Sequence, residues 1–224
     1  EKGVPAGNVI FFPNWVDSTN VFPHSREESL RAEWGFTDAD KIILYSGNLG
    51  GKQGLGSIIE VAELLQDREE IHFVIVGEGE MKAQLMAATT AAGLDNVQFK
   101  PLQPLNKLAA CLASADVHLV LQRKAAANLV MPSKLTNILA VDGHAIVTAE
   151  PGTTLYDVVA ENQLGTLVEP ESPQALREGI EAIIGGEKKQ DILGARHFVR
   201  NHLLKDKILN TFLGELSRLD FKLK

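Results

Sequence analysis

The chain has 224 residues, of which 45% are hydrophobic and 23% are charged, with a formal net charge of −7 and a pI near 5.4. These values are typical of a globular chain with one large or two small domains, and the acidic balance argues against a protein that coats nucleic acid. One cysteine, Cys111, excludes a disulfide within the chain. No apolar run reaches the roughly 18 residues of a membrane-spanning helix. The beginning resembles neither a signal peptide nor a natural start, so we expect a piece of a longer protein.

Apolar runs typical of buried strands alternate with segments of helical spacing along most of the chain. We predict a short strand followed by a turn over 8–17 and a short helix over 27–34. The later predicted strands are 42–45, 71–77, 97–99, 116–121, 145–148 and 165–168. The later predicted helices are 54–66, 81–92, 105–113, 134–141 and 173–184, with one or two more over 191–219. This alternation predicts an α/β fold, with a parallel sheet of about six strands and helices on both faces.

A glycine-rich loop, Gly47-Asn-Leu-Gly-Gly-Lys-Gln-Gly54, joins the strand at 42–45 to the helix at 54–66. Strand, glycine loop and helix together are the layout of an anion site, because the loop has no side chains to block a phosphate and the helix start offers free N–H groups. Lys52 adds a cation. The alternative, an ordinary turn between strand and helix, stays open on this stretch alone.

Two well-known phosphate motifs are not supported. A Walker A loop fails because Ser46 and Gln53 stand where a glycine and a Ser or Thr are needed. A dinucleotide fingerprint fails because Gly77-Glu-Gly79 is followed by Lys82 where the third glycine belongs. The sequence therefore supports neither an NTPase nor a dehydrogenase.

Ligands of parallel sheets bind at the carboxyl ends of the strands, so the loops after Ser46, Val76, Phe99 and Leu121 become site candidates together. Lys134 is placed in a first helical turn, where a cation opposes the helix dipole, which indicates a nearby anion. A bound diphosphate is the simplest account, although a solvated loop or helix surface remains the alternative. The polar residues of these loops are Lys52, Glu78, Lys100, Gln103, Arg123, Lys124, Ser133 and Lys134.

Six motifs follow one another along the chain: Phe12-Pro-Asn-Trp-Val-Asp17, Tyr45-Ser-Gly-Asn-Leu-Gly-Gly-Lys-Gln-Gly54, Val76-Gly-Glu-Gly79, Val97-Gln-Phe99, Ser114-Ala-Asp-Val117 and Pro132-Ser-Lys-Leu-Thr-Asn-Ile-Leu-Ala140. In this order they resemble the carboxyl-terminal, donor-binding domain of a GT-B glycosyltransferase of family 4. The form with Pro-Ser-Lys and Asn-Trp resembles bacterial capsule and O-antigen enzymes of the colanic acid type.

The resemblance implies a Rossmann-like donor domain over 1–224, with a terminal helix over 205–224 that docks on a missing amino-terminal domain. It also implies that Lys52 and Lys134 stabilise the leaving diphosphate, and that the loop after Phe99 meets the base through its backbone. The implied donor-binding residues are Gly47, Asn48, Leu49, Gly50, Gly51, Glu78, Lys100, Pro101, Leu102, Ser133, Leu135 and Asn137.

The chain departs from the family pattern at three positions. Many members carry two glutamates eight residues apart, but here Asn137 stands at the second position and Leu129 or Asn128 at the first. Asn137 can still hydrogen-bond a ribose hydroxyl, and Ser133 with Lys134 is the expected replacement on the sugar side. An arginine common after the first glycine is Asn48 here.

The implied activity is that of a retaining hexosyltransferase of exopolysaccharide synthesis, which uses a nucleoside diphosphate sugar as substrate and no metal or other cofactor. The implied partners are a lipid-linked glycan acceptor and the amino-terminal domain of the same enzyme, with no nucleic acid. The resemblance places the enzyme in the cytoplasm, peripheral to the inner face of the membrane. The base and the sugar stay undetermined, GDP-sugar or UDP-sugar.

Two other classes remain open. One is a sugar-nucleotide epimerase of the same architecture, for which the sequence offers no convincing acid/base pair. The other is a nucleotide-sugar-binding module without catalysis, which the missing glutamates favour slightly. The isolated chain is expected to bind the donor but to turn over poorly or not at all.

Overall fold

The computed structural model describes residues 9–10, 12–124, 131–188 and 191–218, which contain one six-stranded sheet in the order β3-β2-β1-β4-β5-β6. Every neighbouring pair of strands in it is parallel, as the sequence predicted. The strands are β1 (Lys41–Ser46), β2 (Ile71–Val76), β3 (Val97–Lys100), β4 (Val117–Val120), β5 (Ala145–Thr148) and β6 (Thr166–Val168).

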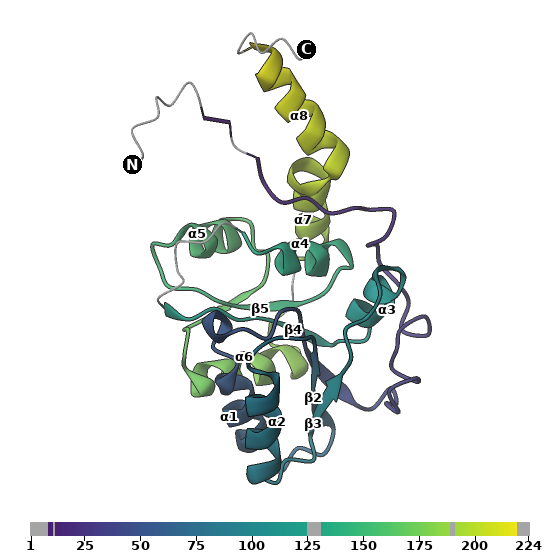
Figure 1. Cartoon of the computed structure of the whole chain (residues 1–224), viewed down its shortest axis with the longest axis vertical. Helices are drawn as coiled ribbons and strands as arrows, with labels where there is room; N and C mark the ends of the chain where they lie inside the picture. Colours follow the sequence, from purple (N-terminus) through teal and green to yellow (C-terminus); the bar gives the residue numbers. More distant parts are fainter. Residues whose placement is uncertain (1–8, 11, 125–130, 189–190, 219–224) are drawn as a thin grey trace.

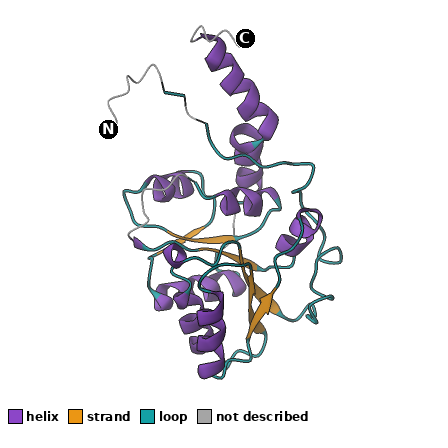
Figure 2. Ribbon diagram, in the orientation of Figure 1, coloured by secondary structure: helices purple, strands orange, loops and turns teal. Residues whose placement is uncertain are grey.

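Helices cover both faces of this sheet, with α1, α2 and α6 on one side and α4, α5 and α7 on the other (Figures 1 and 2). The sheet is therefore enclosed, which is the usual setting of a parallel sheet. The α-helices are α1 (Gly56–Leu64), α2 (Lys82–Ala91), α3 (Leu108–Ala113), α4 (Ser133–Ala140), α5 (Thr154–Glu161), α6 (Pro173–Ile184), α7 (Ile192–Phe198) and α8 (Lys205–Arg218). Short 3-10 turns lie at Gly51–Gln53 and Leu105–Lys107, and a π-helical turn, Val199–Leu203, joins α7 to α8.

The residues of β1 alternate between two cores. Ile42 and Leu44 pack in the core beneath α4, α5 and α7, whereas Ile43 and Tyr45 pack in the core beneath α1 and α6. All four side chains are at most 1% exposed. An unbroken apolar run is what a central strand needs when both of its faces are covered.

Two predicted elements near the amino terminus are wrong. Within 8–17, the described residues form no strand, and a single parallel bridge pairs Val16 with Leu204. Residues 27–34 form turns rather than a helix. The backbone of Leu30 donates to Ser114 Oγ at 2.9 Å, and the buried Arg31 guanidinium donates to carbonyl oxygens of other segments, so long-range bonds replace the helical ones.

The sequence analysis also missed α5. Its cap is local, since the Thr153 hydroxyl accepts from the backbone of Tyr156, and it buries Leu155 and Val159. A cap residue followed by apolar residues at helical spacing was the signal that could have found it.

The strand order places a reversal at the centre of the sheet. The chain moves outward from β1 through β2 to β3 and then returns to β4 on the other side of β1. In open parallel sheets, the crevice beyond the carboxyl ends of the strands at such a reversal is the usual ligand site. Because all strands are parallel, the loops after β1, β2, β3 and β4 open on one edge, as predicted.

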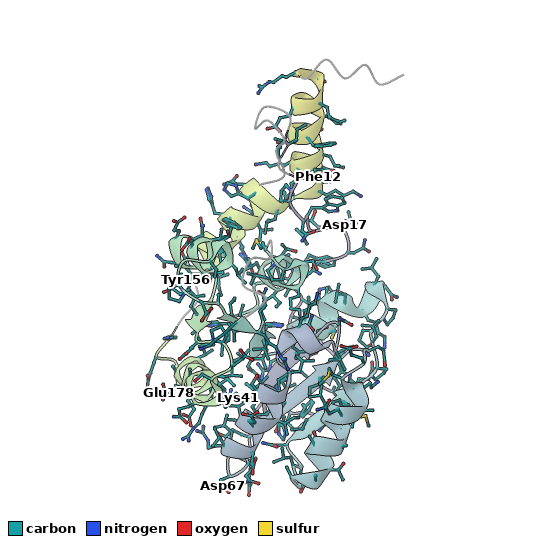
Figure 3. All side chains as sticks on the ribbon, turned by 60° about the vertical axis from the view of Figure 1, so that its left-hand side comes forward. Phe12, Asp17, Lys41, Asp67, Tyr156 and Glu178 are labelled. Carbon is teal, nitrogen blue, oxygen red and sulfur yellow. The ribbon has the colours of Figure 1, made fainter. Side chains whose placement is uncertain are left out.

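The last helix stands apart from the body (Figure 1). Only Ile208 of α8 is buried, and Leu213 is 49% exposed. Phe12 of the amino-terminal segment lies beside this helix (Figure 3), with its ring 4.5 Å from that of Phe212. Among the described residues, no helix has the length and apolar character needed to cross a membrane.

Candidate functional site

The glycine loop after β1 is tied to the turn after β2. The amide of Gly47 donates to the carbonyl of Val76 at 2.9 Å, and that of Leu49 donates to the carbonyl of Glu78 at 2.8 Å. A Cβ on Gly77 would lie 2.0 Å from the carbonyl oxygen of Gly47, so only glycine allows this approach. The Gly-Glu-Gly turn therefore packs directly against the glycine loop and holds it in place.

The outer side of the glycine loop forms a recess of about 380 Å³. Within it, the amide of Gly51 donates to the carboxylate of Glu80 at 3.0 Å. This bond shows that the amide points into the recess and can donate to a negatively charged oxygen. The recess is lined by Asn48, Gly50, Gly51, Lys52, Gln53 and Glu80.

The loop after β4 reaches the glycine loop, as the strand order requires. The backbone of Arg123 donates to the carbonyl of Lys52 at 3.2 Å, and the Arg123 side chain lies against Gly54. Lys124 turns away and pairs with Glu169 at 3.0 Å. Arg123 thus lines the candidate site, whereas the ammonium of Lys124 is paired with Glu169 outside it.

Lys134 brings a second cation beneath the glycine loop. It is the second residue of α4, and its Nζ lies 3.8 Å from the centroid of the Tyr45 ring. A Cβ on Gly47 would lie 3.2 Å from the same Nζ. This Nζ is buried without a hydrogen-bond partner among the described residues, and burial lowers the pKa of Lys134 to about 8.

A small cavity of about 40 Å³, lined by apolar and polar residues, lies beside Lys134. Ser46, His118 and Asn137 line it together with apolar neighbours. Burial lowers the pKa of His118 to about 3, so its ring is neutral near pH 7. Asn137, expected at the ribose, lies on this inner side of α4 beside Lys134.

Three further residues on α4 and on the loop after β2 were predicted to bind the donor, and they differ in how exposed their side chains are. Ser133 is exposed at the helix start, whereas Leu135 is fully buried and its amide already donates to the carbonyl of Pro132 at 2.9 Å. Glu78 is exposed and its carboxylate accepts from Lys82 at 2.6 Å. Leu135 thus belongs to the core of the fold, and the carboxylate of Glu78 is already paired with Lys82.

The predicted base-binding segment follows β3 at the same edge of the sheet. The ammonium of Lys100 lies 6.0 Å from the Trp34 ring centroid. Pro101 and Leu102 are exposed, with Leu102 60% accessible. Their apolar surface is therefore open to a flat ligand, while the carbonyl of Pro101 accepts from the side chain of Gln103 at 2.9 Å. The positions of Asn128 and Leu129, where the family's first glutamate was expected, lie outside the described residues.

Two residues of the site were missed by the sequence analysis. Tyr45 donates its hydroxyl to the carbonyl of Asn48 at 2.8 Å and supports Lys134 through its ring. Glu80 occupies the amide of Gly51. Tyr45 is the last residue of an apolar run directly before the glycine loop, a position that could have marked it. Within the described part of the chain, no cluster of three or more His, Cys, Asp or Glu side chains could hold a metal ion.

The chain is similar to known glycosyltransferases in sequence. The family model described as glycosyl transferases group 1 matches residues 26–198. WcaI of Escherichia coli (strain K12), named as a colanic acid biosynthesis glycosyl transferase, is 44% identical over 220 residues, covering 96% of this chain and 53% of WcaI. WbjE of Pseudomonas aeruginosa, named as a glycosyltransferase, is 25% identical over 183 residues, covering 82% of this chain and 46% of WbjE.

The chain thus spans about half the length of the curated relatives it matches. Among solved structures, Anabaena HepE in complex with UDP and glucose superposes with a TM-score of 0.78 at 16% identity, covering 96% of this chain and 59% of HepE. At this identity the likeness shows a common fold.

Proposed function

The chain belongs to the glycosyl transferases group 1 family, and from this membership we propose that it is the donor-binding half of a glycosyltransferase. The whole enzyme transfers a sugar from a nucleoside diphosphate sugar to a hydroxyl of a glycan acceptor. The chain supplies the donor site over 1–224. The residues of the donor site are those at the carboxyl edge of the sheet.

One observation carries this proposal: the ammonium of Lys134 is buried under the glycine loop without a hydrogen-bond partner among the described residues. An isolated buried charge is costly unless something pairs with it. A diphosphate seated on the loop amides would supply the missing negative charge, and Lys52 would face it from the recess. The bond from Gly51 to the Glu80 carboxylate supports the same use of the loop.

The roles of these residues in the reaction follow from the atoms on which negative charge develops. Transfer breaks the bond between the anomeric carbon of the donor and the diphosphate oxygen, and a new bond forms to the acceptor oxygen. Negative charge grows on the leaving diphosphate. Lys52, Lys134 and the amide of Gly51 stabilise that charge. Lys134 and this amide are held in place before the reaction begins, whereas the exposed Lys52 can move to meet the ligand.

The finer assignments are part of the same proposal. The enzyme is a retaining member of family 4 in colanic acid or capsule synthesis, supported by the identity with WcaI. Its acceptor is a lipid-linked glycan, and the enzyme acts in the cytoplasm at the inner face of the membrane. The backbone of 100–102 meets the base. The helix over 205–224, described here as far as 218, docks on the amino-terminal domain, as its exposed Leu213 supports.

Donor binding is tested directly on this chain. Thermal shift and calorimetric titration with UDP, GDP, their sugars, uridine and guanosine would show one base preferred and the diphosphates bound well above the nucleosides. A ligand that binds only the folded state raises the unfolding midpoint by mass action. No difference between nucleoside and diphosphate for either base would contradict the proposal.

The reaction class needs the full-length protein with labelled nucleotide sugar and a lipid-linked acceptor. Transfer of label to the acceptor supports the glycosyltransferase. An isomerised nucleotide sugar would indicate an epimerase instead, and unchanged bound donor would indicate a binding module. The three outcomes have chemically distinct products.

A further inference from the structure

Tyr45 makes two contacts at the point where β1 passes into the glycine loop. Its hydroxyl donates to the carbonyl of Asn48 at 2.8 Å, and the face of its ring lies 3.8 Å from Nζ of Lys134. Gly47 lies between them, since a Cβ there would be 4.0 Å from the Tyr45 hydroxyl and 3.2 Å from Nζ. The side chain of Tyr45 is fully buried.

The contact with Lys134 joins the two faces of the sheet. Tyr45 packs in the core under α1 together with Leu49 of the glycine loop. Leu135 and Ile138, which anchor α4, pack in the core of the opposite face. Tyr45 is therefore placed to fix the start of α4 relative to the glycine loop, and so the distance between the loop amides and the cation.

Among the described residues around Lys134, the Tyr45 ring is the main group that can stabilise the positive charge of its ammonium. On β4 the nearby titratable group is His118, which is neutral near pH 7, and Ser46 and Asn137 are uncharged. Burial raises the pKa of the Tyr45 phenol, so that group stays neutral as well. Lys52 on the glycine loop and Arg123 behind it are cations and cannot pair with Lys134. An aromatic face attracts an ammonium most strongly where water is excluded.

We propose that Tyr45 is a positioning residue for the donor diphosphate. Its ring holds the Lys134 ammonium in the charged form beneath the glycine loop, and its hydroxyl holds the loop in the conformation that presents its amides. The inference rests on the proposed function. It adds that diphosphate affinity near neutral pH depends on a side chain that itself does not touch the ligand.

The test compares Tyr45→Leu, which removes both contacts, with Tyr45→Phe, which keeps the ring. Affinities for UDP and GDP, relative to uridine and guanosine, are measured by calorimetry from about pH 6 to about pH 10. Tyr156→Leu, the same substitution at the chain's other tyrosine on α5, is the matched control. Ionisation of the ligand affects every variant equally and drops out of the comparison.

In the wild type, affinity should stay level below the pKa of Lys134, about 8, and fall above it, because only the charged lysine attracts the diphosphate. Tyr45→Leu should move the start of this fall down by about one pH unit, so that its deficit at pH 7 shrinks near pH 6 to the few-fold loss that removal of the hydroxyl causes at every pH. Tyr45→Phe should keep the wild-type midpoint while losing a few-fold in affinity at every pH. A wild-type midpoint in Tyr45→Leu overturns the inference, since a merely structural role would not move it.

If Tyr45→Leu does not fold, an NMR measurement on the wild-type chain tests the inference instead. NMR of the lysine side chains, with Lys134 assigned through Lys134→Met, should show its ε-methylene protons shifted upfield by the ring, and their absence of shift overturns the inference. Lys134→Met also separates the two claims. If it leaves diphosphate affinity unchanged, both the proposed function and the role of Tyr45 fail; if it lowers affinity while Tyr45→Leu keeps the wild-type midpoint, only the latter fails.

Discussion

At the scale of single residues, the site depends on two lysines in opposite surroundings. Lys52 lines an open recess and is free to follow a ligand, whereas the ammonium of Lys134 is buried in the folded chain. The first should act mainly on affinity. The second should also affect the stability of the free protein, because its charge is desolvated before any ligand arrives.

Replacing Lys52 by Ala should weaken binding of a nucleoside diphosphate roughly tenfold or more, because a hydrogen bond to a charged group contributes about 1.5–3 kcal/mol. Binding of the free nucleoside should change little. Calorimetry with UDP, GDP and their nucleosides measures both. Lys107→Ala, which removes a surface lysine paired with Glu33, serves as the control. Equal losses for nucleoside and diphosphate would place Lys52 away from the phosphates.

Replacing Lys134 by Met should lower diphosphate affinity and raise the stability of the free chain. The pKa of Lys134 falls from 10.5 to about 8 on folding, so between these values the unfolded state binds more protons and stability rises with pH. Below pH 8 the cost is fully present, on the order of 3 kcal/mol. Urea unfolding should therefore show a stability gain at pH 7 that shrinks towards pH 10. A gain independent of pH would mean that the charge of Lys134 is not its cause.

Replacing Glu80 by Gln should raise affinity for nucleoside diphosphates by roughly threefold to tenfold, because the carboxylate faces the same recess as the ligand and occupies the amide of Gly51. Titration at two salt concentrations checks this, since the gain should shrink as salt screens the charge. Glu63→Gln, on the exposed face of α1, removes the same charge at a distance. A loss of affinity in Glu80→Gln would show instead that the carboxylate orients the loop for the ligand.

At the scale of elements, the site depends on backbone segments that approach closely. The glycine loop rests on the turn after β2 with no room for a side chain at Gly77. The loop after β4 closes one side through the backbone of Arg123. The proposed donor site is thus formed by neighbouring loops that the parallel strands hold at a fixed separation.

Replacing Gly77 by Ala should both destabilise the chain and weaken diphosphate binding, because the added Cβ would lie 2.0 Å from the Gly47 carbonyl oxygen. The expected cost is about 2–4 kcal/mol by urea unfolding. Gly214→Ala is the contrasting change, since nothing lies within 4 Å of a Cβ on this residue of α8. It should stabilise by up to about 1 kcal/mol through helix propensity and leave binding unchanged. Normal binding by folded Gly77→Ala would show that the loop tolerates displacement.

At the scale of the whole molecule, the body of the domain and α8 differ in how they bury their apolar residues. The sheet is enclosed between two cores, while α8 extends from the body with one buried residue and a half-exposed Leu213 (Figure 1). Phe12 and Trp15 of the amino-terminal segment lie near it and are themselves 43% and 39% exposed. Apolar side chains gathered at one end of a domain favour a partner surface there.

Hydrogen exchange on this chain and on the full-length enzyme tests the docking of α8. Amide protection over 206–218 should be low in the chain alone and rise in the full-length protein, because the proposed amino-terminal domain would cover the helix. The amides of β1 should be strongly protected in both and serve as the internal control. Protection of 206–218 that is high and equal in both proteins would mean that the helix belongs entirely to this domain.

Local patterns in the sequence are enough to predict the sheet, most of its helices and the position of the glycine loop. These follow from local signals. Nearly continuous apolar runs such as 71–76, interrupted by His72 alone, mark strands covered on both faces, and glycines with Lys52 after a strand mark a loop open to an anion. The membership of the family, which the comparisons show, was also readable from the order of six motifs. Local patterns suffice here because each element buries residues close together in the sequence.

Tertiary packing, which no local pattern encodes, determines which residues meet across the sheet. It replaced the predicted helix at 27–34 with turns, because Arg31 and Leu30 bond to segments distant in the sequence. It also set the ammonium of Lys134 on the ring of Tyr45 beneath Gly47, which no spacing in the sequence encodes. Strand order brings β1 and α4 together, and the burial that results sets the pKa of Lys134. The electrostatics of the site thus arise from long-range packing, while its framework arises from local pattern.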